Sequence, residues 1–314
     1  MQPIQTIDDM SSLFCALNEC DCWSLHLLRI RSSEKNGVTY FARQITLKPD
    51  GRLKKVVESI SDQYVEGKTS LSNRYDNIVE FDGVNTDKII SRLRTDSDLI
   101  RDAYKAFVCA FSNPEVESNL NTAKYQGYVI NGMLFDNEPV RLISLQNPIT
   151  SYEHKNRFFC EGSAFQEITG DVLQLKNSVD AVVYRGYFYM MNSNAERLFD
   201  MERSYKIKCT IETQHILDQG IVSDSEAFAA AAIAGHNPRK FVSFNQRNLE
   251  MLAASKTKRM KIGKKFGIPL TDEGTFDTTD KKNSDNLIKI LCNKAMLEPF
   301  GKEPMEVESA RSWK

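Results

Sequence analysis

The pattern of apolar and polar residues predicts a helix followed by a β-hairpin at the start of the chain. Residues 6–17 repeat apolar side chains at helical spacing, and either Thr6 or Asp8 can cap that helix. Residues 22–31 then alternate between the two faces of a strand. A polar turn leads into residues 38–45, a second β-rich run, so the two runs are expected to pair as a hairpin.

The same criteria predict helices and short strands along the rest of the N-terminal half. Helices are expected at residues 50–60, 87–93 and 97–111, and strands at 78–81, 125–134 and 140–145. The polar, turn-prone stretch 148–156 is typical of a domain boundary. It divides the chain into an N-terminal mixed α/β domain, residues 1–150, and a C-terminal domain, residues 151–314.

The C-terminal half begins with short strands and continues with helices. A meander is expected at 158–165, 173–176, 179–184 and 187–191, followed by helices at 194–200, 202–217, 225–234, 245–254 and 286–291. Arg185 and Gly186 form the tight turn between the last two strands. The predicted fold class is therefore α+β (mixed α/β), with β-meander sheets packed with helices in two domains.

Composition favours a folded, soluble chain without a membrane span. Of the 314 residues, 41% are hydrophobic and 26% charged, and the net charge is −1, so the signature of disorder is absent. No apolar run approaches the roughly 20 residues that cross a bilayer, and the polar, acidic start predicts no signal peptide. The seven scattered cysteines are typical of reduced, buried thiols in a reducing compartment.

A basic run provides the strongest local charge feature. Six of the ten residues 256–265 are basic and none is acidic. If this run is helical, Lys258, Lys261 and Lys265 lie near one face, while Leu252, Met260 and possibly Ile262 are expected to anchor the segment in the core. Such a stripe can bind DNA phosphates without reading the base sequence. The alternative is a solvated helix face whose lysines maintain solubility.

The residues predicted to contact the DNA phosphate backbone are Lys256, Lys258, Arg259, Lys261, Lys264 and Lys265. A weaker basic cluster, Arg52, Lys54 and Lys55, is expected to form the exterior of a helix instead.

Catalytic and metal-binding motifs are not predicted. Asp180 and Glu196 are the best-placed acids for a Mg²⁺-dependent nuclease, but the next strand lacks the Glu-x-Lys that such enzymes place beside the metal. Asp180 is expected to begin a strand and Glu196 to favour a helix N-terminus. The four histidines are far apart, and Gly263 is not part of a phosphate-binding loop. The chain is therefore expected to be no enzyme and to use no cofactor.

Residues 178–200 place an aspartate in a strand, then a tight turn, an aromatic strand and a Glu-x-x-Phe sequence. This order resembles the central motif of the family typified by KwaB of the Kiwa anti-phage defence system. The matching residues are Asp180, Gly186, Tyr187, Tyr189, Glu196 and Phe199, whereas Ala195 stands where the family usually has phenylalanine. The resemblance covers roughly residues 158–314, including the basic run and the terminal stretch 309–314.

The resemblance implies a cytoplasmic homodimer that binds DNA with little sequence preference. It also implies a membrane partner, KwaA, which would hold the protein at the inner membrane, and a defence that hinders phage replication or transcription. The family motif itself assigns no DNA-binding role to the basic run. Two alternatives stay open from the residues: a Mg²⁺-dependent nuclease that uses Asp180 and Glu196, and a protein–protein interaction module without DNA binding.

Overall fold

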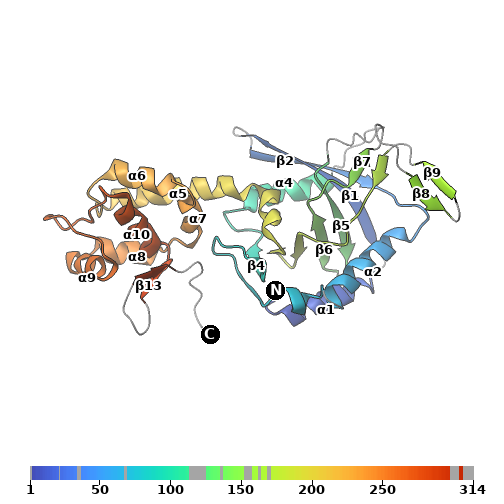
Figure 1. Cartoon of the computed structure of the whole chain (residues 1–314), viewed down its shortest axis with the longest axis horizontal. Coiled ribbons are helices and arrows are strands. Elements are labelled where there is room, and N and C mark those ends of the chain that lie inside the picture. Colours follow the sequence, from blue (N-terminus) through green and yellow to red (C-terminus); the bar gives the residue numbers. More distant parts are fainter. Residues whose placement is uncertain are drawn as a thin grey trace. The chain divides into compact units, whose positions relative to one another are not determined.

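The computed structural model describes residues 2–20, 22–33, 37–66, 69–112, 125–134, 137–151, 158–161, 164–167, 171–297 and 304–306. Its contacts divide the chain into two units (Figure 1). The first consists of Met1–Glu80 and Asn85–Asp200, and the second consists of Phe81–Val84 and Met201–Lys314. Strands dominate the first unit and helices the second, which confirms the predicted α+β class.

An eight-stranded sheet forms the centre of the first unit, in the order β2-β1-β5-β6-β11-β12-β4-β3. Its strands are β1 (Trp23–Ser33), β2 (Gly37–Ile45), β3 (Asn77–Glu80), β4 (Ile89–Arg94), β5 (Gly127–Met133), β6 (Pro139–Ser144), β11 (Ala181–Tyr184) and β12 (Tyr187–Met190). Neighbouring strands are antiparallel except β3 and β4, which are parallel. Two small sheets pair β7 (Ile149–Ser151) with β10 (Asp171–Leu173), and β8 (Phe158–Glu161) with β9 (Ala164–Glu167).

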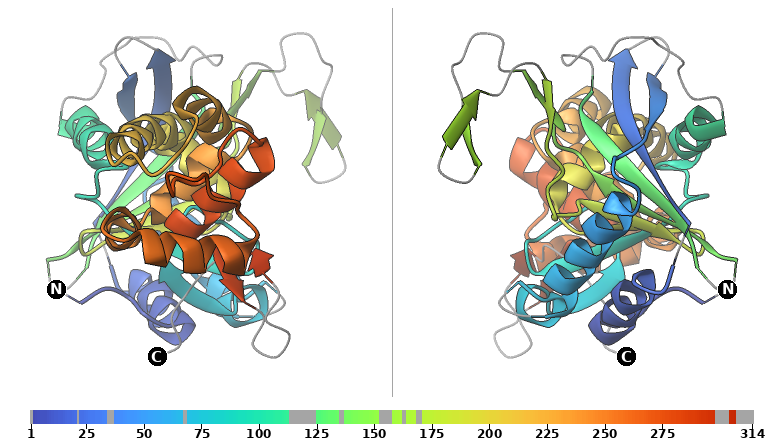
Figure 2. Two further views of the ribbon diagram at one scale, coloured as in Figure 1. Left: turned by 90° about the vertical axis from the view of Figure 1, so that its left-hand side faces the viewer. Right: turned by 90° about the vertical axis from the view of Figure 1, so that its right-hand side faces the viewer.

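Helices cover both faces of this sheet (Figures 1 and 2). One face carries α1 (Ile7–Leu17), α2 (Arg52–Val65) and the short α3 (Leu71–Arg74), and the other carries α4 (Arg101–Ser112). Strand alternation explains the division, because successive side chains point to opposite faces. Leu25 and Leu27 of β1 join the buried cluster with Phe14 and Ile60, while His26 between them makes an edge-to-face contact with Phe111 of α4.

Local signals placed several of these elements correctly. Thr6 caps α1 in a capping box with Asp9, as one of the two expected caps. The β1–β2 and β11–β12 hairpins are both present. Arg185 and Gly186 adopt left-handed φ values of 49° and 76°, the conformation that a two-residue hairpin turn requires.

The helix predicted for residues 87–93 is wrong, because this segment contains strand β4. Its backbone pairs with β12 on one side and β3 on the other. Ile90 and Leu93 are buried, but long-range pairing rather than their spacing determines the conformation. The following helix begins at Arg101, four residues later than predicted.

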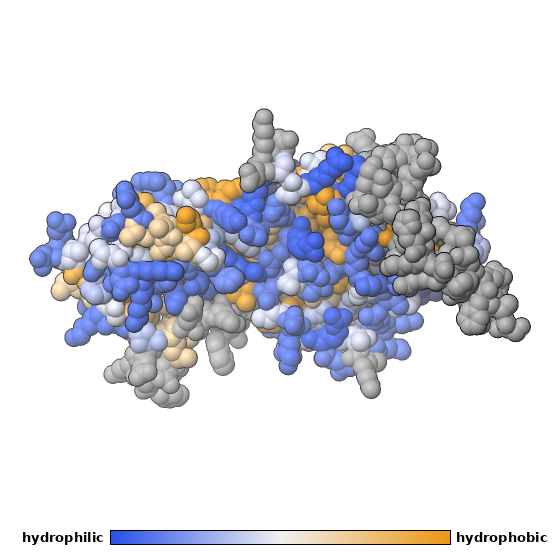
Figure 3. All heavy atoms as spheres, turned by 45° about the horizontal axis from the view of Figure 1, so that its top comes forward, coloured by the Kyte–Doolittle hydropathy of each residue, from blue (hydrophilic) through white to orange (hydrophobic). Residues whose placement is uncertain are grey.

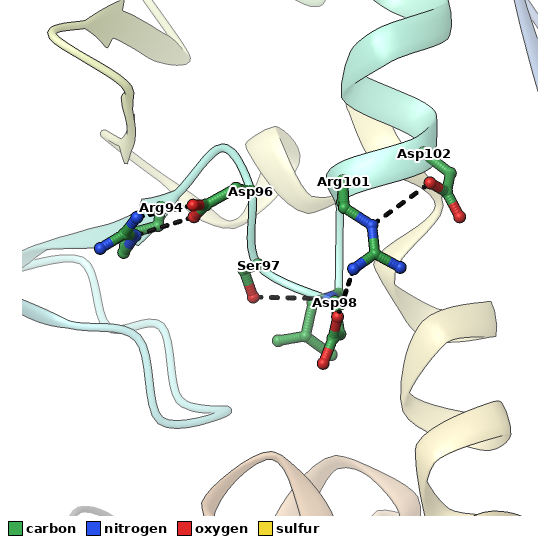
Figure 4. A network of polar contacts seen from close by, with 7 residues as sticks. Arg94, Asp96, Ser97, Asp98, Arg101 and Asp102 are labelled. Carbon is green, nitrogen blue, oxygen red and sulfur yellow. Dashed lines mark hydrogen bonds and ion pairs between the residues drawn. The ribbon is translucent and has the colours of Figure 1, made fainter.

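A network of polar contacts links the end of β4, the turn that follows it and the first turn of α4 (Figure 4). Arg94 donates two hydrogen bonds to the carboxylate of Asp96, at 2.8 and 2.6 Å. Arg101 contacts Asp98 at 2.9 Å and Asp102 at 3.4 Å. The hydrogen bond from Arg94 lowers the pKa of Asp96. These pairs are exposed, so they organise the turn rather than contribute much stability.

The second unit is built from helices. It contains α5 (Met201–Asp218), α6 (Ser225–Ile233), α7 (Asn237–Lys240), α8 (Gln246–Ala253), α9 (Lys256–Phe266), α10 (Lys281–Leu291), the 3-10 helix η3 (Phe241–Ser243) and the strands β13 (Ala295–Leu297) and β14 (Pro304–Glu306). Its core includes Phe228, Phe241 and Leu287, all fully buried. The segment Phe81–Val84 belongs to this second unit. The ammonium of the buried Lys294 lies 3.3 Å from the carboxylate of Asp82 in that segment.

The division at Asp200 and Met201 differs from the boundary expected within residues 148–156. Two strands that follow the polar stretch, β11 and β12, pair with β6 and β4 in the main sheet. Residues up to the 3-10 helix η2 (Ser193–Phe199) therefore pack with the first unit, where Phe199 meets Phe188 with ring centroids 4.8 Å apart. The described part of the polar stretch, residues 148–151, therefore belongs to the first unit, and residues 152–156 lie outside the described residues.

The expectation of buried cysteines holds for only some of them. Cys20, Cys209 and Cys292 are buried, whereas Cys15, Cys22 and Cys109 are exposed. These six are free thiols. In the described part of the chain, none of the helices has the length and apolar character needed to cross a membrane.

Candidate nucleic-acid interface

The basic run folds into helix α9, and its own flanking residues define its ends. The side chain of Ser255 caps the helix by accepting a hydrogen bond from the backbone N–H of Lys258 at 3.3 Å. At the other end, Gly267 adopts a left-handed φ of 67°, and the next N–H donates to the carbonyl of Gly263. The chain therefore reverses direction at Gly267 and passes close to the last turn of α9.

The inner face of α9 is fixed by close contact with the segment that follows it. A Cβ atom at Gly263 would lie 2.3 Å from Leu270 and 2.6 Å from the carbonyl oxygen of Ile268. Only glycine permits this approach. Ile262, beside it, packs partly buried against the core of the second unit, as predicted.

The opposite face of α9 carries four exposed lysines: Lys258, Lys261, Lys264 and Lys265. No acidic residue interrupts the helix. Met260 was predicted to anchor the helix, which is wrong, because its side chain is 55% exposed. Ile262, Gly263 and Phe266 define the buried face instead. The expectation for Leu252 is confirmed, since it is buried at the end of α8.

Two of the six predicted phosphate contacts instead bond within the fold. Arg259 is half-buried and donates to three carbonyl oxygens, those of Gly274 at 2.7 Å, Leu252 at 2.7 Å and Ala253 at 3.1 Å. The ammonium of Lys256 is exposed but donates to the carbonyl of Asp272 at 2.9 Å. The structure thus separates the basic run into four outward lysines and two side chains that hold neighbouring backbone.

Part of the charge on α9 also suits the helix itself. Lys264 and Lys265 lie in the last turn, where the partial negative charge of the helix C-terminus favours cations. Lys258 and Lys261 lie nearer the start and gain nothing from this effect. Their exposure on a face without acids is therefore the feature that points to an anionic partner.

The weaker basic cluster lies at the start of α2, in the first unit. Arg52 and Lys55 are exposed there and Lys54 is half-buried. This placement agrees with the expected helix exterior.

Asp180 has a structural position. One carboxylate oxygen accepts from the backbone N–H of Leu145 at 2.6 Å, and the other accepts from the side-chain amide of Asn192 at 2.7 Å. The residue is 4% exposed and immediately precedes β11, close to the strand start predicted for it. Both oxygens therefore serve to join the ends of β6 and β12.

Glu196 lies in the first turns of η2 and accepts a hydrogen bond from the side-chain amide of Asn85 at 2.6 Å. Within the residues that the structure describes, no group of three or more histidines, cysteines, aspartates or glutamates is arranged to hold a metal ion. Among the described residues, Asp180 and Glu196 therefore make hydrogen bonds within the fold and are not part of such a group.

A pocket in the first unit was missed by the sequence reasoning. It lies on the α4 face of the sheet, with Arg141, Asn131 and His26 among its lining residues. Arg141 of β6 and Asn131 of β5 are direct partners across two adjacent strands. The alternation of side chains along each strand could have indicated the face on which each residue lies. Only the order of the strands in the sheet brings the two residues together.

Comparison with known proteins gives one match. A family model described as Kiwa protein KwaB-like matches residues 136–297. The match begins just before β6 and continues through α9 and α10 to β13. No curated protein and no solved structure matched the chain. Because the match covers more than half of the sequence and includes the motif at residues 178–200, this chain belongs to the KwaB-like family of Kiwa anti-phage defence proteins.

Proposed function

We propose that this protein acts in Kiwa anti-phage defence by binding DNA with little sequence preference through the outward lysines of α9. The observation that carries the proposal is the exposure of Lys258, Lys261, Lys264 and Lys265 on one capped helix that contains no acidic residue. Membership of the KwaB-like family supports the defence context.

The chemistry of these side chains explains the expected mode of binding. Each lysine is a compact point charge that pairs with a phosphate and releases a condensed counterion. Such contacts position the protein on DNA but carry no sequence information. Held in this way, incoming phage DNA would be a poorer template for replication and transcription.

The decisive experiment measures binding of the full chain to a fluorescent DNA duplex across a salt series. The variant Lys258→Glu/Lys261→Glu/Lys265→Glu is expected to bind all duplexes weakly, whatever their sequence. A matched control, Lys55→Glu/Lys281→Glu/Lys282→Glu, reverses three exposed lysines elsewhere and should keep the binding. Equal affinity of the first variant and the parent chain would place the DNA site outside α9.

A plasmid incubated with Mg²⁺ tests the nuclease alternative in the same preparations. The plasmid is expected to stay intact, because both oxygens of Asp180 are engaged by backbone and side-chain donors. Cleavage that disappears in a folded Asp180→Asn variant would make the nuclease the better description.

A role in partner binding is a second candidate, favoured by exposed apolar residues on α5 and α6. Ile207 and Ile211 lie one turn apart on α5 and are 51% and 50% exposed, and Ile233 at the end of α6 is 65% exposed. Figure 3 shows apolar atoms gathered over these two helices. Docking of the membrane protein KwaA, or of a second copy of this chain as a homodimer, would cover such residues.

The partner hypothesis is tested by the variant Ile207→Glu/Ile211→Glu. We expect it to lose co-purification with KwaA, and with it the attachment to the inner membrane, while DNA binding by α9 persists. Sedimentation of the same variant tests the homodimer. Unchanged association in both assays would exclude this surface as the docking site.

A further inference from the structure

Helices α8 and α9 are joined by a short connection and held together at it. Ala254 and Ser255 link the two helices, and Ser255 is extended, with φ −149° and ψ 112°, so the chain leaves the axis of α8 before α9 begins. The guanidinium of Arg259 on α9 donates to the carbonyls of Leu252 and Ala253 at the end of α8. A short turn between two packed helices is the arrangement in which many DNA-binding proteins present their second helix to the duplex.

The end of α10 supports this pair of helices. The side-chain amide of Asn248 donates to the carbonyl of Ile290 at 3.2 Å and to the side chain of Asn293 at 3.0 Å. The backbone N–H of Asn245 donates to the carbonyl of Leu291 at 2.9 Å. Because α8 is bonded to the end of α10 and α9 is bonded to α8, the outer face of α9 is presented on a fixed support.

The outer face of α9 contains uncharged residues as well as lysines. Four exposed residues at spacings of three, four and seven positions form one stripe along the helix: Thr257, Met260, Lys261 and Lys264. Lys258 and Lys265 flank this stripe on one side. Thr257 and Met260 carry no charge, and the side chain of Met260 is 55% exposed. Contacts with phosphates use the lysines but give Thr257 and Met260 no partner.

The major groove of B-form DNA offers partners to both kinds of residue. The groove is about 12 Å wide and about 8.5 Å deep, so it admits an α-helix about 10–12 Å in diameter. Phosphates line its walls, and its floor presents base edges that include the methyl group of thymine. Lysines with long flexible stems can reach the walls while uncharged side chains face the floor. The major groove of A-form RNA is too narrow for side chains to read.

We infer that α9 lies in the major groove of B-form duplex DNA, with Thr257 and Met260 against the base edges and α8 as its support. The four outward lysines pair with the phosphates. Two small base contacts without bidentate hydrogen bonds select sequence only weakly, so binding stays largely independent of sequence. The inference rests on the proposed DNA binding by α9, and it adds the groove, the form of the duplex and the residues that meet the bases.

Duplexes that differ in the major groove test this geometry with the full chain, by fluorescence anisotropy at one salt concentration. A DNA duplex is compared with an RNA duplex of the same sequence and with a DNA duplex whose cytosines carry glucosylated 5-hydroxymethyl groups. The sugar is neutral and fills the major groove while the phosphates stay unchanged. Both changes should weaken binding about tenfold, because α9 then reaches phosphates only from outside the groove.

Met260 has a test of its own, because deoxyuridine lacks the methyl group of thymine. The parent chain should bind a duplex of A·T pairs about fourfold more tightly than the same duplex with deoxyuridine, the gain expected for burying about one methyl group. Met260→Ala should abolish this preference. Met251→Ala, which truncates an exposed methionine on α8, is the matched control and should keep it.

The outcomes separate this inference from the proposed function. Equal affinity for the DNA, RNA and glucosylated duplexes would overturn the inference and leave α9 as a phosphate contact on the outside of the duplex. A thymine preference that survives in Met260→Ala would overturn it as well. If no duplex binds at low salt, the proposed function itself fails, and the inference fails with it.

Discussion

The Nε atom of Arg259 donates a hydrogen bond to the carbonyl oxygen of Gly274 at a distance of 2.7 Å. The same guanidinium also donates to the carbonyls of Leu252 and Ala253 at the end of α8. One arginine thereby joins α8, α9 and the segment that follows α9. Among the six basic residues of the run 256–265, Arg259 fixes the position of the helix that carries the exposed lysines.

Replacing Arg259 should therefore reduce stability more than DNA affinity. We expect Arg259→Met to lower the free energy of unfolding by about 2–4 kcal/mol, because three carbonyls lose a charged donor. Urea denaturation measures this change. Lys258→Met, at an exposed position on the same helix, should alter stability by no more than about 0.5 kcal/mol. Equal losses in the two variants would contradict the structural role of Arg259.

Neutralising the outward lysines should change the salt dependence of DNA binding. For Lys258→Gln/Lys261→Gln/Lys265→Gln, the slope of log affinity against log salt should become shallower by about 0.9 for each phosphate that the variant no longer neutralises. Fluorescence anisotropy across a salt series measures the slope. The decrease should be the same for unrelated duplex sequences, and a sequence-dependent decrease would argue for base contacts instead.

Asp180 should contribute strongly to the stability of the fold. Asp180→Ala removes the acceptor for the Leu145 N–H and for the amide of Asn192. We expect the free energy of unfolding to fall by about 2–4 kcal/mol, since hydrogen bonds to a buried carboxylate are removed and their donors are left unpaired. Chemical denaturation gives the value. The exposed Asp272 is the control, and Asp272→Ala should change stability by no more than about 0.5 kcal/mol.

His26 should make the protein sensitive to mild acid. Because burial lowers its pKa in the folded state, the unfolded chain binds the proton first as the pH falls through about 6.5. Stability is thus complete above that pH and declines below it, until the pH falls through the folded-state pKa. Melting curves between pH 7 and pH 5 measure the decline, and His26→Gln should flatten it.

The carboxylates should act in a separate pH range. The pKa values of Asp9, Asp96 and Asp277 are lowered by side-chain hydrogen bonds from Thr6, Arg94 and Thr279, respectively. Their contributions to stability are present above the ordinary pKa of an aspartate and are lost only as the pH falls below about 4. A decline between pH 7 and pH 5 that persists in His26→Gln would exclude His26 as its source.

Features governed by neighbours in the chain were predictable from the sequence. The capping box at Thr6, the hairpin turn at Arg185 and Gly186, and the helical spacing of residues 256–265 all depend on side chains within a few positions of one another. The lysines at spacings of three and four residues necessarily share one helix face. The outward face of α9 was therefore visible in the sequence before its exposure was known.

What only the tertiary structure decided depends on partners far away in the chain. Residues 89–94 are a strand because β12, almost a hundred residues later, pairs with them, and Arg259 is structural because the chain returns to place Gly274 beside it. The pocket at Arg141 exists only because β1, β5 and β6 are neighbours in the sheet. The sequence by itself determined the local elements and the basic helix face, because capping, turns and periodicity are short-range. Strand order, burial and the partner of each charge are long-range, so the same residues acquire those properties only in the folded chain.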